Sequence, residues 1–407
     1  ARVCGGESAW DYLPAVLLAV SSGYACWCSG GLETQLFTFL ITLGILSYVE
    51  GSLTRAGLVF ALATLTRPEG ALIFAVVALH HLVTTRRFVP SRSELLGCMT
   101  FVLVVAPYFA WRWWYYGWPF PNTFYVKTGV APNASLARDV TANGAYYAWQ
   151  WATQSKALWA LPLAVLAIFV NRRFASLAWL LSVVYLAYVV RIGGDFMGLH
   201  RFVMPLFVTT ALLATMGLRR VVDWLPARGR VLGGALALAF LLAAFSASQV
   251  TLTRSSLVPI AEHGIDRPGY LALYAHDREL MGKALAAHVR PDDFAIVGGV
   301  GVLPYYARLA AIDVFGLVSE RIAHEVPPTS ARPGHQKWAP ASLLLSMSPT
   351  LILHCYDLHR APESYRLCGE AAFFAAHGYE PVTMHVPGLR ERGEYFTFLR
   401  RQDRPWP

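Results

Sequence analysis

Four short segments gather ionisable and hydrogen-bonding side chains in a chain that is otherwise strongly apolar. They read SGGLET, TRPEG, PNTFYVK and GGDFMGLHRF, and they start at positions 29, 66, 121 and 193. A guanidinium fork such as that of Arg67 suits a phosphate group, and His200 could transfer a proton near neutral pH. The segments therefore predict a site for a polar ligand that carries a charged group.

Three of these segments also have a purely structural interpretation. Glu33 could be a helix-terminal carboxylate near water. Arg67 and Glu69 could form an ion pair that seals a turn, because the proline between them fixes the backbone. Asp195 and Arg201 could likewise pair with each other. Ionisable residues beside a membrane nevertheless favour a functional site, so both interpretations stay open.

The segment PNTFYVK follows a run of aromatic residues that anchoring at a membrane interface explains. Pro119 and Pro121 bracket a rigid, extended stretch. Asn122, Tyr125 and Lys127 are not needed for anchoring, and they better suit a polar ligand with a charged group.

The composition indicates how these segments are held. The chain has 407 residues, of which 56% are hydrophobic and 14% charged, whereas soluble domains carry about 25% charged residues. This predicts a polytopic α-helical membrane domain together with a soluble portion. The net charge of +9 does not indicate nucleic acid, because the arginines fall in short loops between apolar runs.

A helix that crosses a bilayer needs about 20 largely apolar residues. The TRPEG segment interrupts one long apolar stretch with two charges, a proline and a glycine, so we expect two helices there rather than one re-entrant element. About nine candidate spans result, some of them short: Leu13–Cys28, Gln35–Val49, Ala56–Thr66, Ala71–Val83, Leu95–Trp114, Ala157–Val170, Phe174–Val190, Phe202–Leu218 and Val231–Val250.

The loops between these spans alternate in composition. TTRRFVPSRS, NRRF and RRVVDWLPARGR are rich in arginine and are predicted to be cytoplasmic. The other loops contain all four polar segments, which are therefore expected together on the extracytoplasmic side. The last span exits to that side, so the prediction is a transmembrane domain over residues 1–250 and an extracytoplasmic domain over residues 251–407.

The C-terminal domain has the pattern of an α/β fold. An amphipathic helix is predicted over Arg278–Val289, and a helix is expected to start within LPYYARLAA. Cys355 and Cys368 could form a disulfide in an oxidising compartment, or they could remain inert thiols. The strand candidates are Phe294–Val297, Ala311–Val314, Leu351–His354, Pro381–Val386 and Tyr395–Leu399.

The order of the motifs resembles a known family. SG-LET, TRPEG, PNTFY-K and GGDFM…RF…P, followed by G-x-LPYY and IDVFGL, are similar to the membrane glycosyltransferases of the GT-C superfamily. The resemblance extends over nearly the whole chain, and it is nearest to the group that contains the mycobacterial terminal β-(1→2)-arabinofuranosyltransferase.

This resemblance implies a multi-pass protein of the bacterial inner (plasma) membrane whose active face is extracytoplasmic. Such an enzyme would pass a sugar from a polyprenyl-phosphate carrier to a glycan or lipid acceptor, with inversion at the anomeric carbon. The resemblance suggests arabinofuranose as the donor sugar. The sequence itself does not determine the sugar, the acceptor or a requirement for a divalent cation. The carrier phosphate needs a cation, and the acceptor hydroxyl needs a carboxylate base.

The sequence departs from the family in one respect. Relatives carry a carboxylate pair, often Asp-Asp, in their first outward loop, whereas the only acids before Leu13 here are Glu7 and Asp11. We therefore expect that the chain is truncated at its N-terminus and that the principal catalytic Asp lies upstream.

The resemblance then assigns roles to the residues that are present. Asp195 is expected to be a supporting catalytic carboxylate that positions the acceptor. The candidates for the carrier phosphate are Arg67, Lys127 and Arg201, and those for the sugar pocket are Glu33, Glu69, Asn122, Tyr125 and His200.

Two other functions remain open at this point. A transporter or flippase for a lipid-linked sugar would use the same cargo, but it should carry polar residues near the middle of its spans. Here the polar groups gather at one end of the spans, which favours an enzyme. A non-catalytic membrane protein of envelope or flagellar assembly is the second alternative.

Overall fold

The computed structural model describes residues 9–86, 89–127 and 132–404. The chain divides into two compact units. Unit 1 comprises Ala1–Pro119 and Thr141–Ser256, and unit 2 comprises Phe120–Val140 and Leu257–Pro407. A single cut after residue 250 does not describe this division, because the segment around PNTFYVK belongs to unit 2.

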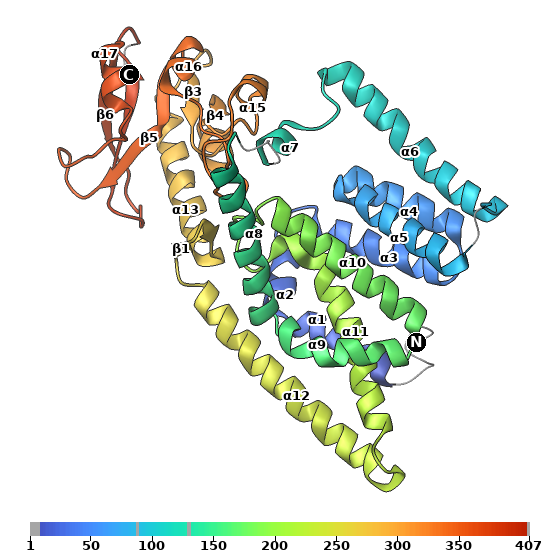
Figure 1. Ribbon diagram of the computed structural model, residues 1–407. Helices are drawn as coiled ribbons and strands as arrows, with labels where there is room; N and C mark the ends of the chain where they lie inside the picture. The colour runs from blue at the N-terminus through green and yellow to red at the C-terminus, as the bar shows by residue number, and fades with distance from the viewer. Residues whose placement is uncertain (1–8, 87–88, 128–131, 405–407) are drawn as a thin grey trace. The chain divides into compact units, whose positions relative to one another are not determined.

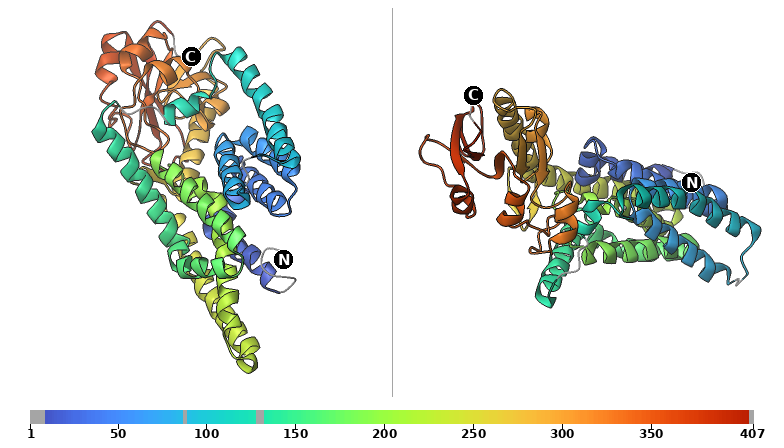
Figure 2. Two further views of the ribbon diagram at one scale, coloured as in Figure 1. Left: turned by 45° about the vertical axis from the view of Figure 1, so that its right-hand side comes forward. Right: turned by 90° about the horizontal axis from the view of Figure 1, so that it is seen from above.

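Unit 1 is helical. Helices α3, α4 and α5, drawn in blue, lie side by side in all views (Figure 1, Figure 2). The helices of this unit are α1 (Leu13–Val20), α2 (Ser22–Cys28), α3 (Thr34–Val49), α4 (Leu53–Thr66), α5 (Glu69–Thr85), α6 (Arg92–Tyr116), the second part of α8 (Ala134–Gln154), α9 (Ala157–Leu166), α10 (Arg172–Arg191), α11 (Met204–Asp223) and α12 (Ala227–Ser256), with short 3-10 turns at Ala9–Tyr12, Ala167–Phe169 and Arg201–Val203.

Helix α11 is the core helix of unit 1, because it packs against α1, α3, α9 and α10. Its side chains Met204, Leu206 and Met216 are buried. By contrast, α6 and α12 expose large apolar side chains along their length, among them Leu103 and Phe240. Apolar surface of this extent on long helices suits a lipid environment rather than water.

Among the described residues, four helices are long and apolar enough to cross a membrane, or five if one bent pair counts as a single span. The four are α6, α10, the segment Arg201–Asp223 and the segment Val231–Ser256, and the bent pair joins α8 to Ala157–Phe169 at an angle of 75°. Helices α3, α4 and α5 are apolar but shorter. The structure thus shows several apolar helices, and nine spans remain a prediction.

Close helix packing in unit 1 depends on glycine. A Cβ atom on Gly217 of α11 would lie 1.9 Å from the carbonyl oxygen of Leu163 on α9. A Cβ atom on Gly57 of α4 would lie 2.1 Å from the carbonyl oxygen of Gly97 on α6. Small residues at such contacts are typical of helix pairs in membranes, because they let two backbones approach each other.

Two apolar stretches are each broken into two helices, at TRPEG and at Ser21, and only the first break is visible in the sequence. TRPEG separates α4 from α5. Two helices are therefore present there, and their crossing of the membrane as two spans stays a prediction. The candidate span Leu13–Cys28, however, is two helices, because Ser21 has an extended backbone (ψ 116°) between α1 and α2. The backbone N–H of Ser22 at the break donates to the Gln249 side chain of α12 instead (3.1 Å).

Unit 2 contains a mixed five-stranded sheet with the strand order β4-β3-β5-β7-β6, drawn in orange and red in Figure 1. Strand β3 is parallel to β4 and β5, while β7 is antiparallel to β5 and β6. These strands contain the core of every predicted strand: β3 (Phe294–Val297), β4 (Ala310–Asp313), β5 (Leu351–His359), β6 (Tyr379–His385) and β7 (Tyr395–Arg401).

The two faces of this sheet carry separate cores, because successive side chains of a strand point to opposite faces. Ala295 and Val297 of β3 lie in a core with α13 and α14, whereas Ile296 lies in a core with α15, α16 and α17. Helix α13 begins ten residues before the predicted helix. The remaining elements are α7 (Asn122–Lys127), the first part of α8, a ribbon of β1 (Ala261–Glu262) and β2 (Ile265–Asp266), α13 (Pro268–Leu285), α14 (Val302–Ala307), α15 (Glu320–Glu325), α16 (Ala341–Ser346) and α17 (Ala371–Ala376).

Candidate functional site

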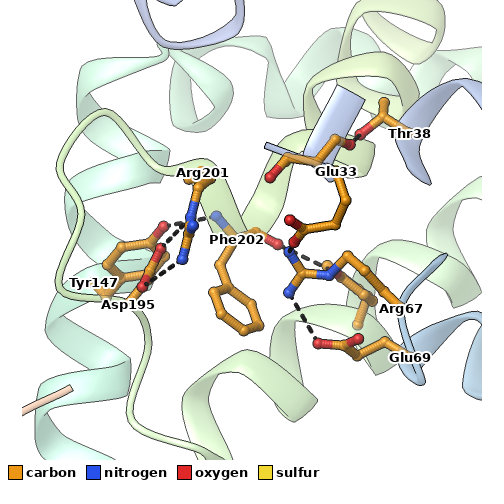
Figure 3. Close-up of polar contacts among 10 residues, drawn as sticks. Glu33, Thr38, Arg67, Glu69, Tyr147, Asp195, Arg201 and Phe202 are labelled. Carbon is orange, nitrogen blue, oxygen red and sulfur yellow. Dashed lines mark hydrogen bonds and ion pairs between the residues drawn. The ribbon is translucent and has the colours of Figure 1, made fainter. Parts of the chain in front are cut away.

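Three charged residues of unit 1 meet where helices α3, α4 and α5 begin or end. Glu33 directly precedes α3, Arg67 follows α4, and Glu69 is the first residue of α5. Arg67 Nη1 donates to Glu33 Oε1 (3.1 Å), and its Nη2 donates to Glu69 Oε1 (3.0 Å), as Figure 3 shows. Arg67 adopts an extended backbone, as a residue before proline prefers. The Arg–Glu pair considered from the sequence is therefore present, and a second carboxylate joins it.

The two carboxylates of this group are exposed to different degrees. The side chain of Glu69 is 8% exposed, whereas that of Glu33 is 43% exposed. Glu33 uses one carboxylate oxygen on Arg67, and its Oε2 has no hydrogen-bond partner among the described residues. Glu33 is therefore the member of the group that an incoming molecule can reach.

A second ion pair lies in the loop between α10 and α11. Arg201 Nε donates to Asp195 Oδ2 (2.8 Å), and its Nη2 donates to Asp195 Oδ1 (3.1 Å). Both side chains are buried. This bidentate pair leaves Nη1 of Arg201 without a partner among the described residues. The structural pairing considered from the sequence is thus present, and one donor remains for an acceptor such as a phosphate oxygen.

The preceding glycine pair gives this loop its shape. Gly193 and Gly194 both have positive φ angles (89° and 75°), which favour glycine. A Cβ atom on Gly194 would also lie 2.7 Å from the side chain of Tyr147. The hydroxyl of that tyrosine accepts a hydrogen bond from the backbone N–H of Phe202 (3.1 Å), which holds the loop against α8.

Phe202 lies between the Glu33–Arg67–Glu69 group and the Asp195–Arg201 pair. Its ring lies between them in Figure 3, and the Cζ atom of Arg67 is 4.5 Å from the ring centroid. Arg201 is adjacent in sequence and lies over the ring of Trp27 (5.9 Å). We call Glu33, Arg67, Glu69, Asp195 and Arg201 the five-residue cluster. Its three carboxylates and two guanidinium groups carry a net charge of −1.

His200 lies beside the five-residue cluster as a neutral side chain. Its Nε2 is 2.9 Å from Oε1 of Gln154, and because an amide oxygen only accepts, Nε2 carries the proton. Burial lowers the pKa of His200 to about 3. At neutral pH the ring therefore carries no charge, and proton transfer from a charged imidazolium is not available there.

The buried state of His200 predicts a pH dependence of stability. The unfolded chain binds this proton below a pKa of about 6.5, whereas the folded chain binds it only near 3. Between these values the unfolded state holds more protons, so the free energy of unfolding falls by up to about 1.4 kcal/mol per pH unit as the pH decreases. Above pH 6.5 this contribution is constant. Thermal unfolding of the detergent-solubilised chain from pH 8 to 4 measures it.

The control for this experiment compares two histidine variants. His200→Gln cannot titrate and keeps a donor for Gln154, so its unfolding temperature should depend less on pH than that of the parent. His263 is exposed, and His263→Gln should keep the parental slope. Identical slopes for His200→Gln and the parent would show that His200 is not held neutral by burial.

Two apolar cavities among the helices of unit 1 are lined in part by α11. One, of about 230 Å³, is lined by side chains of α3, α5, α10 and α11. Tyr185 lines it, and the hydroxyl of this residue donates to the carbonyl oxygen of Phe202 (3.1 Å). The other, of about 550 Å³, is lined by α1, α9, α11 and α12 and also by Trp151 and Lys156. Apolar space thus adjoins the loop that carries Asp195 and Arg201 of the five-residue cluster.

The remaining predicted site residues belong to unit 2. Asn122, Tyr125 and Lys127 lie on α7, which packs against α15. The ring of Tyr125 is 4.3 Å from the ring of His324 on α15. The predicted site residues therefore fall into two sets, with Asn122, Tyr125 and Lys127 in unit 2 and Glu33, Arg67, Glu69, Asp195, His200 and Arg201 in unit 1.

Sequence reasoning did not identify the residues that position the cluster. Tyr147 and Gln154 lie about 50 residues before the loop that they hold, and nothing in their local sequence marks them. Phe202 is part of the GGDFMGLHRF segment, but an aromatic residue at the start of an apolar run carries no distinct signal. His324 is likewise unmarked.

Comparison with known proteins identifies the fold. Residues 270–399 match a family described as a domain of unknown function (DUF8728). No curated protein matches the sequence. Two crystal structures of ArnT from Cupriavidus metallidurans are similar to the chain, each at 13% sequence identity. The apo structure has a TM-score of 0.54 and covers 97% of this chain and 79% of ArnT.

The second structure is ArnT bound to undecaprenyl phosphate, with a TM-score of 0.53 over 96% of this chain and 78% of ArnT. The chain therefore has an ArnT-like fold, in which several apolar helices accompany a C-terminal domain that contains a sheet.

Proposed function

We propose that this protein transfers a sugar from a polyprenyl-phosphate carrier to a glycan or lipid acceptor. The observation that carries the proposal is the five-residue cluster, in which carboxylates and guanidinium groups meet at helix ends beside apolar space. A lipid-linked sugar needs these three features together, since its chain is apolar, its phosphate is anionic and its acceptor must lose a proton. The likeness to ArnT bound to undecaprenyl phosphate supports the proposal.

In the proposed reaction Glu33 is the general base, in place of the upstream Asp that the family resemblance implies. Its accessible carboxylate takes the proton of the acceptor hydroxyl, whose oxygen attacks the anomeric carbon. The bond between that carbon and the carrier phosphate breaks, and the electron pair leaves with the phosphate. The configuration at the anomeric carbon is inverted in this single displacement.

The other members of the cluster have supporting roles in this proposal. Arg67 holds Glu33 and Glu69 in place. Its Nε has no hydrogen-bond partner among the described residues and is the donor that we propose for the carrier phosphate. Arg201 directs its unpaired Nη1 toward the leaving phosphate, and the buried Asp195 holds that guanidinium in position. His200 is a further candidate contact to the sugar in unit 1. Asn122, Tyr125 and Lys127 belong to unit 2, and their contacts to sugar and phosphate stay a prediction from the sequence.

We also propose that the active face and unit 2 are extracytoplasmic and that the protein spans the bacterial inner membrane. The arginine-rich loops follow α5, precede α10 and follow α11. Arg67 and Glu69 of the cluster lie where α4 ends and α5 begins, at the end of α5 opposite to its arginine-rich loop. A disulfide joins Cys355 to Cys368, and such bonds persist in oxidising compartments. Arabinofuranose is the first donor sugar to test.

Carrier binding tests the proposal before any acceptor is known. Polyprenyl phosphate should bind the detergent-solubilised chain at least about tenfold more tightly than the uncharged polyprenol, a difference of about 1.4 kcal/mol. Native mass spectrometry with the two lipids in competition measures this ratio. Equal binding of the two lipids would contradict a site built for a phosphate.

Matched arginine variants locate the phosphate contact. Arg201→Lys keeps the charge but loses the planar fork. The ratio of polyprenyl phosphate binding to polyprenol binding should therefore decrease. Arg254 is an exposed residue of α12, and Arg254→Lys should preserve the preference. A preference that is unchanged in Arg201→Lys would remove Arg201 from the phosphate site.

A further inference from the structure

Four side chains of unit 2 gather potential metal ligands around the disulfide. His354 and Cys355 lie on β5, while Cys368 and Glu370 lie just before α17. The ligand atoms of His354, Cys368 and Glu370 lie within 4.8 Å of one another, and no other such group occurs in the part of the chain that the structure describes. Cys355 joins the group because its sulfur is bonded to that of Cys368.

We propose that these four residues form a Zn²⁺ site once the disulfide is reduced. Reduction turns the disulfide into two thiols, which lose their protons when zinc binds, and the ligand set then becomes two thiolate sulfurs, one imidazole nitrogen and one carboxylate oxygen. Zinc takes four such ligands in tetrahedral geometry, and thiolate and imidazole are the ligand types that it prefers. The disulfide and the zinc site are therefore alternative states of the same residues. The inference does not depend on the proposed transfer reaction.

The nitrogen and oxygen ligands are already held in position. The side chain of His354 is buried, and its ring meets the rings of Trp338 and Phe374 edge-on (6.0 and 5.9 Å). Nε2 of His354 is 3.1 Å from Oε2 of Glu370. The other oxygen of Glu370 accepts from Nε1 of Trp338 (3.3 Å). Outer contacts of this kind orient the ligands of a metal and are a regular part of such sites.

The sulfur ligands have a favourable environment and room to move. The backbone N–H of Cys368 lies 3.1 Å from Sγ of Cys355, where it would stabilise a thiolate. Two zinc–sulfur bonds of about 2.3 Å at a tetrahedral angle place the sulfurs about 3.8 Å apart. The segment between β5 and Cys368 forms no helix or strand and is largely exposed, so it can adjust to this separation.

Electrons and protons balance in this conversion. A dithiol reductant supplies two electrons and two protons, becomes a disulfide itself and leaves two cysteine thiols. Zn²⁺ then displaces the two thiol protons. The proton on Nε2 of His354 moves to Nδ1, which has no hydrogen-bond partner among the described residues, and Nε2 becomes the ligand atom.

Cobalt(II) is a suitable probe, because tetrahedral cobalt–thiolate sites absorb visible light and zinc displaces the metal. The full chain would carry serine in place of Cys4, Cys26, Cys28 and Cys98, so that only the disulfide pair can contribute thiolates. After reduction with dithiothreitol and anaerobic removal of the reagent, we expect one equivalent of Co²⁺ to bind with this spectrum. The unreduced protein should give none. A reduced protein without the spectrum would overturn the proposal.

A carboxylate variant tests the complete ligand set. Glu370→Gln keeps both cysteines, so its fold can be checked in the oxidised form by circular dichroism. It should bind Co²⁺ at least about tenfold more weakly after reduction. Glu363 is an exposed acid on the same segment, and Glu363→Gln should bind Co²⁺ like the parent. Equal affinity of Glu370→Gln and the parent would exclude the four-residue site.

Discussion

Replacing Glu33 with Gln is expected to lower sugar transfer by at least about 100-fold, because general-base catalysis typically contributes a factor of 10² to 10⁴. Glutamine has nearly the same shape as glutamate and can still accept from Arg67. The variant should remain folded, because the side chain of Glu33 is 43% exposed and Arg67 keeps its buried partner Glu69. Initial rates of label transfer per folded protein give the measurement.

Helix α3 supplies a matched control for this experiment. Glu33 precedes its first residue, and Glu50 follows its last residue, where it pairs with Arg55. Glu50→Gln removes the same charge at the opposite end of the same helix and should leave transfer unchanged. If Glu33→Gln and Glu50→Gln transfer equally fast, the base lies elsewhere.

Replacing Asp195 with Asn is expected to destabilise unit 1 by about 3–5 kcal/mol, because the buried charge of Arg201 then loses its partner. Transfer should fall as well, since the guanidinium would no longer be held toward the phosphate. The unfolding temperature and the free energy of unfolding in a denaturing detergent measure the first effect. Activity at low temperature, expressed per folded molecule, measures the second.

A double-mutant cycle measures the interaction free energy between Asp195 and Arg201 apart from their contacts to other residues. Asp195→Asn with Arg201→Gln removes both charges, and its cost should be smaller than the sum of the two single costs by about 1–3 kcal/mol. The double variant should regain stability but not transfer, because the donor to the phosphate is lost. Additive single costs would show that the two side chains do not interact in the folded protein.

The strands of unit 2 and most helices of unit 1 could be predicted because their signals are local. Phe294–Val297 and Leu351–Leu353 are uninterrupted apolar runs, as expected for strands that are buried on both faces. Ile296 and Ile352 lie in one core, and their neighbours Val297 and Leu353 lie in the other. The break at Ser21 was not predicted, since its cause is distant in sequence. The freed N–H of Ser22 is satisfied by Gln249, and Gly23 lies so close to Leu199 that a Cβ atom would be 2.7 Å from its carbonyl oxygen.

In the candidate site, too, contacts between residues close in sequence could be predicted and contacts between distant residues could not. Arg67 with Glu69, and Asp195 with Arg201, are at most six residues apart, so both pairings could be anticipated. The contact between Glu33 and Arg67 links residues 34 positions apart and needs the packing of α3 against α4. Phe202 joins the two groups only after the loop has folded, so no sequence pattern shows its role.

Sugar transfer itself tests the central claim most directly. The full chain would be reconstituted in proteoliposomes with radiolabelled polyprenyl-phosphate arabinofuranose and a glycan acceptor, and other donor sugars would follow in parallel. The account predicts that label enters the acceptor while an equal amount of polyprenyl phosphate is released, and that the new glycosidic bond has the inverted configuration. Label that crosses the bilayer but stays linked to its carrier, with every donor tried, would contradict a transferase and indicate a transporter.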